Sequence, residues 1–103
     1  MKKLPANAAR QQAAELSDWR YDESAGAISR KFAFADFAQA FSFMTEIALA
    51  AEKRDHHPDW SNGYNKVEVT WTTHDAGGLT ELDIALARVC DAAFERRGRT
   101  AKK

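Results

Sequence analysis

The sequence lacks several features that would point to a particular class of protein. It has one cysteine among 103 residues, which excludes an intramolecular disulfide. Lysine and arginine number 15, as do aspartate and glutamate, so no overall charge points to nucleic acid or a membrane surface as a partner. No apolar run approaches the roughly 20 residues of a membrane-spanning helix, and the N-terminus has no apolar segment typical of a signal peptide. We expect a cytoplasmic protein that binds neither nucleic acid nor membrane.

What is present is typical of one soluble domain. Hydrophobic residues make up 45% and charged residues 29% of the chain. A chain of this length can bury one core but not two, so we expect a single domain over residues 1–103. The C-terminal "RRGRTAKK" has five cations and no acid. We expect this basic tail, about residues 97–103, to be disordered.

Apolar residues at three- and four-residue intervals predict two long helices. The first runs from Asp36 to about Lys53, and Asp36 with Gln39 resembles a capping box. Its predicted apolar face consists of Phe37, Ala40, Phe41, Met44, Ile47, Ala48 and Ala51. Phe43 falls off that face and is predicted to lie on the surface or in a subunit contact.

The second long helix begins after Thr80, which forms a predicted capping box with Asp83. Its expected apolar face consists of Leu82, Ala85, Leu86, Val89, Ala93 and Phe94. The Ala-rich "NAARQQAAEL" predicts a shorter N-terminal helix, with Asn7 as its cap.

Alternating residues predict the strands. "DWRYDESAGAISRKFAF" is typical of a β-hairpin with a short first strand at Trp19–Tyr21. "NGYNKVEVTWTTH" predicts another strand, and a further short one lies near Trp60. The order is therefore α-β-β-α-β-β-α. It predicts an α+β fold, a two-layer sandwich in which helices cover one face of a four-stranded antiparallel sheet.

The three histidines are the most distinctive residues. His56 and His57 are adjacent in "AEKRDHHPDW", and His74 follows in "WTTHDAGG". Neighbours in an extended segment point in opposite directions, so His56 and His57 are poorly placed to bind one metal ion, and we expect no metal site. Both can face one cleft only if the backbone leaves regular extended geometry. The plain alternative is a pair of surface or hydrogen-bonding histidines.

Acid–base catalysis is the other use of such a cluster. Imidazole has an unperturbed pKa of about 6.5, so it can donate and accept protons at neutral pH. No serine or cysteine stands in a recognisable nucleophile motif, and no Gly-rich phosphate loop is present. Cys90, in "ALARVCDAAF", is expected to be a small buried helical residue. Among the catalytic chemistries considered, these residues leave non-covalent proton transfer.

The spacing of the polar residues is more specific than composition or periodicity. Glu52 is followed by His56-His57-Pro58, Tyr64, His74 and Asp83, and this spaced set resembles the signature of the pterin-4a-carbinolamine dehydratases. The phrases "FADFAQAFSFMTEIALAAEKRDHHPDW", "YNKVEVTWTTHDAGGLTELD" and "DWRY" support it. The resemblance covers about residues 19–93.

The resemblance implies an activity and a site. Members of that family remove water from 4a-hydroxytetrahydropterin to give quinonoid dihydropterin, during tetrahydrobiopterin recycling after an aromatic amino acid hydroxylase, without a cofactor. By motif position, His56, His57 and His74 are the catalytic residues. Glu52, Asp59, Trp60 and Thr73 are candidates for pterin binding, although Trp60 and Tyr64 are also typical core residues. The capping role of Asp83 already explains its presence.

The resemblance also implies partners. The family forms dimers through sheet edges and tetramers through helix packing, so a homodimer or homotetramer is expected. Animal members also act as dimerisation cofactors of a homeodomain transcription factor. A non-catalytic interaction module therefore remains the alternative function.

Overall fold

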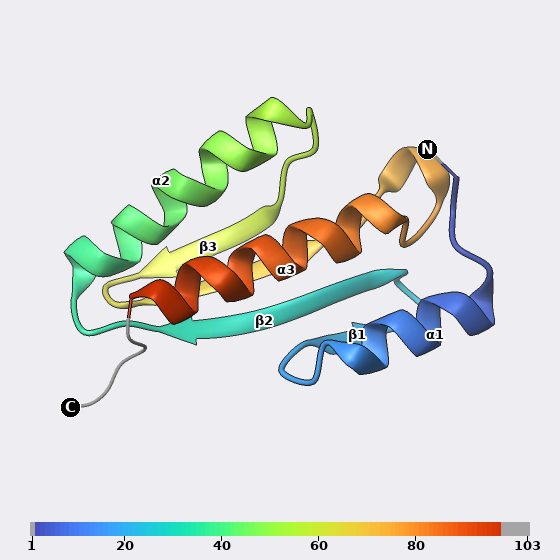
Figure 1. Ribbon diagram of the computed structural model, residues 1–103, viewed down its shortest axis with the longest axis horizontal. Helices are drawn as coiled ribbons and strands as arrows, with labels where there is room; N and C mark the ends of the chain where they lie inside the picture. Colours follow the sequence, from blue (N-terminus) through green and yellow to red (C-terminus); the bar gives the residue numbers. More distant parts are fainter. Residues whose placement is uncertain (1, 98–103) are drawn as a thin grey trace.

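The computed structural model describes residues 2–97 and confirms the predicted order of elements (Figure 1). The elements in chain order are α1 (Ala6–Glu15), β1 (Arg20–Asp22), β2 (Ala27–Ala33), α2 (Phe37–Lys53), β3 (Asp59–Gly63), β4 (Lys66–Trp71), the 3-10 helix η1 (His74–Ala76) and α3 (Glu81–Arg96). The segment expected to be a disordered tail, residues 97–103, lies outside the described residues except for Arg97. Within residues 2–97, no helix is long and apolar enough to cross a membrane.

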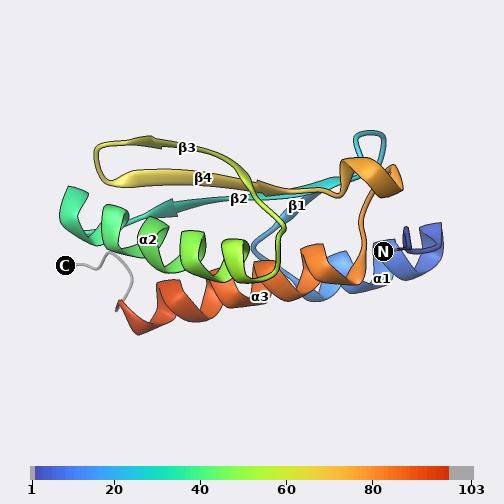
Figure 2. The same cartoon turned by 90° about the horizontal axis from the view of Figure 1, so that it is seen from above.

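The four strands form one antiparallel sheet in the order β1-β2-β4-β3. The three α-helices cover one face of this sheet, and no described element covers the other face (Figure 2). The predicted two-layer α+β sandwich is therefore confirmed. The sheet twists over a core that receives every second side chain of β2 and β4, including Ile28, Phe32, Val67, Val69 and Trp71.

The predicted apolar face of α2 is wrong in part. Phe43 is fully buried and packs on Phe32 and Phe34 with ring centroids 4.9 and 5.0 Å apart, whereas Phe37 and Phe41 are 49% and 57% exposed. The physical reason is that α2 carries two apolar stripes, each with three- and four-residue spacing. The stripe buried against the sheet consists of Ala40, Phe43, Ile47 and Ala51.

The buried surface of α3 is broader than predicted. Leu86, Ala93 and Phe94 are buried as expected, but Leu82 and Val89 are only partly buried. Helix α3 lies between α2 and α1 (Figure 1), and more of its apolar side chains are buried than the predicted face contains. These additional buried apolar residues are Ile84, Ala87 and Cys90.

The ends of the helices are stabilised by capping residues and by contacts with neighbouring helices. Asp36 caps α2 by accepting a hydrogen bond from the Gln39 N–H at 2.8 Å, as predicted. Asn7 does not cap α1, because the helix already begins at Ala6, after Pro5. Proline has no N–H and a fixed φ near −65°, so it is well suited to a helix start. At the other end of the chain, Arg97 donates hydrogen bonds to Glu46 of α2 and to the Ser42 hydroxyl.

Candidate active site

The turn that ends α2 determines where the first histidine lies. The His56 N–H donates to the Ala51 carbonyl at 3.0 Å, and the Asp55 N–H donates to the Glu52 carbonyl at 3.1 Å. Asp55 has a left-handed φ of 51°. This pair of bonds is a Schellman motif, with aspartate at the position where glycine is commonest. The chain therefore reverses direction at His56, and the backbone leaves regular extended geometry just before His57.

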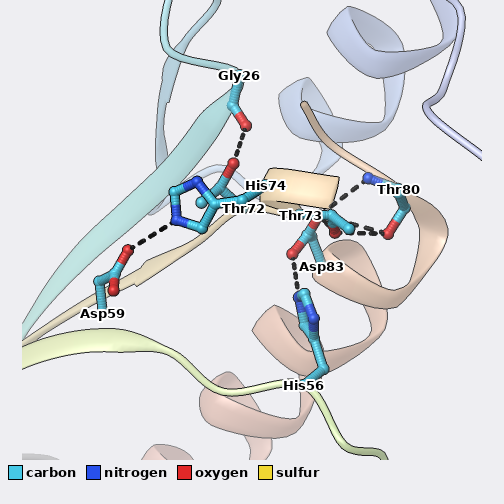
Figure 3. Close-up of polar contacts among 8 residues, drawn as sticks. All are labelled: Gly26, His56, Asp59, Thr72, Thr73, His74, Thr80 and Asp83. Carbon is cyan, nitrogen blue, oxygen red and sulfur yellow. Dashed lines mark hydrogen bonds and ion pairs between the residues drawn. The ribbon is translucent and has the colours of Figure 1, made fainter. Parts of the chain in front are cut away.

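The His56 ring is directed inward, toward the start of α3. Its Nε2–H donates to the Asp83 Oδ1 atom at 2.6 Å, and only 12% of the His56 side chain is exposed (Figure 3). The imidazole also stacks on the Trp71 indole, with centroids 5.7 Å apart and planes inclined by 17°. Contacts on an edge and a face of the ring hold His56 in one orientation, with Nε2 committed to Asp83.

Asp83 joins two parts of the site through one carboxylate. While Oδ1 accepts from His56, Oδ2 accepts from the Thr73 hydroxyl at 2.7 Å and from the Thr80 N–H at 2.9 Å (Figure 3). The predicted capping box of Thr80 and Asp83 is confirmed. The Asp83 side chain is completely buried, where a charge is tolerated only with such a full set of donors. Its capping role is therefore only part of its function.

His57 has a different partner and a wetter environment. Its Nε2 atom lies 2.8 Å from the Glu52 Oε1 atom in the last turn of α2, and 57% of the His57 side chain is exposed. An exposed contact of this kind adds only about 0–1 kcal/mol to stability, even between two charged groups. The Glu52 carboxylate therefore serves to orient the imidazole more than to hold the fold together.

His74 lies on the opposite side of the site, on η1. Its side chain is 81% exposed, and its Nε2 atom lies 3.7 Å from the Asp59 Oδ2 atom at the start of β3 (Figure 3). That distance is too long for a hydrogen bond. The position of His74 therefore depends on the backbone that carries it.

All three histidines line one open cleft of about 230 Å³. The cleft is formed by Asp55, His56, His57, Thr72, Thr73, His74 and Asp75. The structure thus brings together the three predicted catalytic residues and Thr73. Asp59 contacts His74, and Glu52 contacts His57. The sequence interpretation missed Thr72, which lies two positions before His74, and Trp71 beneath His56.

Two aromatic candidates lie elsewhere. Trp60 is on the helix-facing side of β3, opposite Val69, and is partly buried against the core. Its predicted role in pterin binding stays a prediction. Tyr64 is exposed at the tip of the β3–β4 hairpin. The six residues of β4 separate it from the histidines, and a strand of that length spans about 20 Å.

Cys90 is not available as a nucleophile. It is fully buried, and that burial raises the pKa of its thiol to about 12. The thiolate, which is the reactive form, is therefore absent at neutral pH. The expectation of a structural cysteine is confirmed.

Comparison with known proteins identifies the family of this chain. The family model described as pterin 4 alpha carbinolamine dehydratase matches residues 2–93. The chain belongs to this family. It is 51% identical over 96 residues to a Rhizobium johnstonii protein, with 93% of this chain and 95% of that one covered. It is 56% identical over 92 residues to a Mesorhizobium japonicum protein, covering 89% and 94%. Both relatives are provisionally named pterin-4-alpha-carbinolamine dehydratase.

Solved structures extend the family relationship to the fold. A transcriptional coactivator/pterin dehydratase from Brucella melitensis is 44% identical, with a TM-score of 0.84 over 89% of this chain and 98% of that one. A pterin dehydratase-like RuBisCO assembly factor of the alpha-carboxysome is 27% identical, with a TM-score of 0.65 over 74% and 88%. Pterin dehydratase relatives with this fold thus include proteins described by roles other than catalysis.

Proposed function

We propose that this protein is a hydro-lyase that removes water from 4a-hydroxytetrahydropterin to give quinonoid dihydropterin, in the recycling of tetrahydrobiopterin after an aromatic amino acid hydroxylase. The observation that carries the proposal is the convergence of His56, His57 and His74 on one cleft, each with a carboxylate partner. Family membership supplies the substrate class.

The reaction needs only proton transfers. The C4a–O bond breaks, the departing hydroxyl takes a proton and leaves as water, and N5 loses its proton while its electron pair forms the C4a=N5 bond. No electrons leave the substrate, so the residues need only supply one proton and accept another. Each well-placed general acid or base is typically worth about 10²–10⁴ in rate.

The residues take these roles by position. His56 and His57 carry out the acid and base work around the 4a hydroxyl and N5, and His74 binds the pterin and shares in proton transfer. Asp83 orients His56 and Glu52 orients His57, as their hydrogen bonds indicate. Asp59 and Thr73 flank His74 and complete the pterin-binding side of the cleft.

We further propose that the protein forms a homodimer or homotetramer. Helix α2 exposes Phe37, Phe41 and Leu49, and the Phe37 and Phe41 rings contact each other at 5.9 Å. Large apolar side chains exposed together on one helix are typical of an interface. Sedimentation velocity with Phe41→Glu should show a smaller species than the wild type, and an unchanged sedimentation coefficient would remove α2 from the interface.

The alternative function is a non-catalytic interaction module. The exposed stripe of α2 favours it, since the same surface would receive another protein, and the coactivator and assembly-factor descriptions belong to relatives with this fold. Direct titration with the dimerisation segment of a homeodomain factor separates the two functions, because binding with no dehydration would favour the module.

The dehydratase proposal is tested by stopped-flow measurement of the breakdown of enzymatically generated 4a-hydroxytetrahydropterin. We expect the wild type to accelerate water loss, and His57→Ala and His74→Ala each to lose about 10²-fold or more. Lys66→Ala, an exposed change at the far end of β4, is the matched control and should retain full activity. Adding a chelator should change nothing. A wild type no faster than the spontaneous reaction would reject the proposal.

A further inference from the structure

His74 lies on a short loop that closes on itself. The Thr73 N–H donates to the Gly78 carbonyl and the Gly78 N–H donates to the Thr73 carbonyl, both at 3.3 Å. Between them, Gly77 adopts a left-handed φ of 82° that returns the chain toward the sheet. Because His74 itself is mostly exposed, the placement of its imidazole follows from the placement of this loop, residues 73–78.

The loop packs against the turn between β1 and β2, which is far from it in sequence. The Thr72 hydroxyl donates to the Gly26 carbonyl at 2.7 Å (Figure 3). Gly26 has a φ of 63°, and a Cβ atom built on it would lie 2.7 Å from the Gly78 Cα atom. Carbon atoms pack best at about 3.5–4.0 Å, so two backbones meet here at a distance that no side chain at position 26 permits.

The β1–β2 turn also makes side-chain contacts of its own. The Asp22 carboxylate accepts hydrogen bonds from the Ser24 hydroxyl at 2.8 Å and from the Ala25 N–H at 3.1 Å, and these bonds lower the pKa of Asp22. Next to it, Glu23 forms a two-bond ion pair with Arg10 of α1, at 3.0 and 2.7 Å. These exposed contacts shape the turn and connect it to α1, but an exposed ion pair adds only about 0–1 kcal/mol to its stability.

The N-terminal segment holds the opposite side of the loop. The Leu4 N–H donates to the Leu79 carbonyl at 2.8 Å, and the atoms nearest to a Cβ built on Gly78 belong to the Lys3 side chain, the first at 3.2 Å. The Lys3 side chain is exposed and flexible, so it can yield. A side chain at position 26 would therefore force the β1–β2 turn and residues 73–78 apart.

We propose that Gly26 is a positioning residue for His74. Because Gly26 has no side chain, the β1–β2 turn contacts residues 73–78 directly and determines where this loop, and with it the His74 imidazole, lies. Nothing in the signature of spaced histidines and carboxylates includes this residue. The placement of His74 stands on geometry alone, whereas its effect on rate rests on the proposed dehydratase function. A shift of about 1 Å in such a group can cost about 10²-fold in rate.

The test reads the imidazoles directly. Histidine ring protons are recorded by NMR for the wild type, Gly26→Ala and the control Gly63→Ala, and His74→Ala identifies the His74 signals by their loss. A Cβ on Gly63 meets nothing within 4 Å. We expect Gly26→Ala to shift the His74 signals and leave the His57 signals in place, and Gly63→Ala to shift neither. Unmoved His74 signals in folded Gly26→Ala protein would overturn the proposal.

Kinetics supply the second readout. Gly26→Ala should lower kcat/KM by about 10²-fold in the wild-type background and have little effect in the His74→Ala background, because contributions that act through one residue are not additive. Equal losses in both backgrounds would contradict the proposal. Ala93→Gly, at the far end of α3, controls for stability alone and should leave kcat/KM unchanged.

The proposal stays testable if Gly26→Ala does not fold or if the wild type is inactive. If Gly26→Ala does not fold, Thr72→Val removes the hydroxyl that donates to Gly26 and takes its place in the NMR test, where unmoved His74 signals again contradict the proposal. If the wild type does not dehydrate the pterin, the proposed function fails, and the His74 signals alone decide the role of Gly26.

Discussion

The two sides of the histidine cleft are built differently. On the α2–α3 side, His56 is 12% exposed, bonded to a buried carboxylate and stacked on Trp71. On the η1 side, His74 is 81% exposed, and its charged neighbour Asp59 is 3.7 Å away. One imidazole is held by its own side-chain contacts, while the other is held by the backbone beneath it.

Together with the proposed function, this difference predicts how the two histidines contribute to stability and to catalysis. A buried, hydrogen-bonded histidine contributes to both, because removing it leaves Asp83 unpaired in the interior. An exposed histidine on a well-held loop contributes to function with little effect on stability. Substitutions on the two sides should therefore separate the two quantities.

Asp83→Asn should give the largest effect, because it removes the charge that His56, Thr73 and Thr80 share. We expect the free energy of unfolding to fall by about 3 kcal/mol and kcat/KM to fall by about 10²-fold or more. Denaturant titration and the stopped-flow assay measure these quantities.

Asp91→Asn is the matched control on the same helix. The Asp91 carboxylate accepts hydrogen bonds from the Arg30 guanidinium at 2.7 Å and from the Trp19 indole N–H at 2.8 Å. It lies away from the cleft. We expect Asp91→Asn to lower the free energy of unfolding while kcat/KM stays at the wild-type value. If Asp83→Asn also kept full activity, the anchored side would have no catalytic importance.

Alkaline pH tests the packing beneath the anchored side. Burial raises the pKa of Cys90 from 9.0 to about 12, so the folded protein keeps the thiol proton where the unfolded chain loses it. This stability is fully present below pH 9 and is lost as pH rises toward 12, by up to about 1.4 kcal/mol between pH 9 and 10. Unfolding free energies of the wild type and Cys90→Ala at pH 8 and 10 measure it, and an equal loss in both would contradict the assignment.

A smaller effect is expected at the turn that carries His56. Asp55 occupies a left-handed conformation with φ of 51°, where glycine has no steric penalty. Asp55→Gly should raise the free energy of unfolding by up to about 1 kcal/mol. The neighbouring Arg54, with φ of −99°, is the control, and Arg54→Gly should destabilise the protein. Destabilisation by both changes would show that the turn is not strained.

The sequence predicts the features that depend on local pattern. Alternation and helical spacing indicate the elements, and the capping residues Asp36 and Thr80 locate the starts of α2 and α3. The spacing of the histidines identifies the catalytic candidates, because a signature records which residues a site needs.

Contacts between distant segments do not follow from such patterns. Asp83 lies 27 residues from His56, and only the fold shows that its carboxylate meets both that ring and Thr73. The prediction for Phe43 is wrong because two stripes of α2 have the same periodicity, and only packing against the sheet decides which stripe is buried. Gly26 resembles any turn glycine until the backbone of Gly78 is found against it.

The most direct test of this account compares His56→Ala with His74→Ala, using kcat/KM for 4a-hydroxytetrahydropterin dehydration and the free energy of unfolding of each variant. We predict that both lose about 10²-fold or more in kcat/KM. We also predict that His56→Ala loses about 2 kcal/mol of stability and His74→Ala less than about 0.5 kcal/mol. Equal stability losses would contradict the division between the two sides, and full activity in either variant would contradict the shared catalytic cleft.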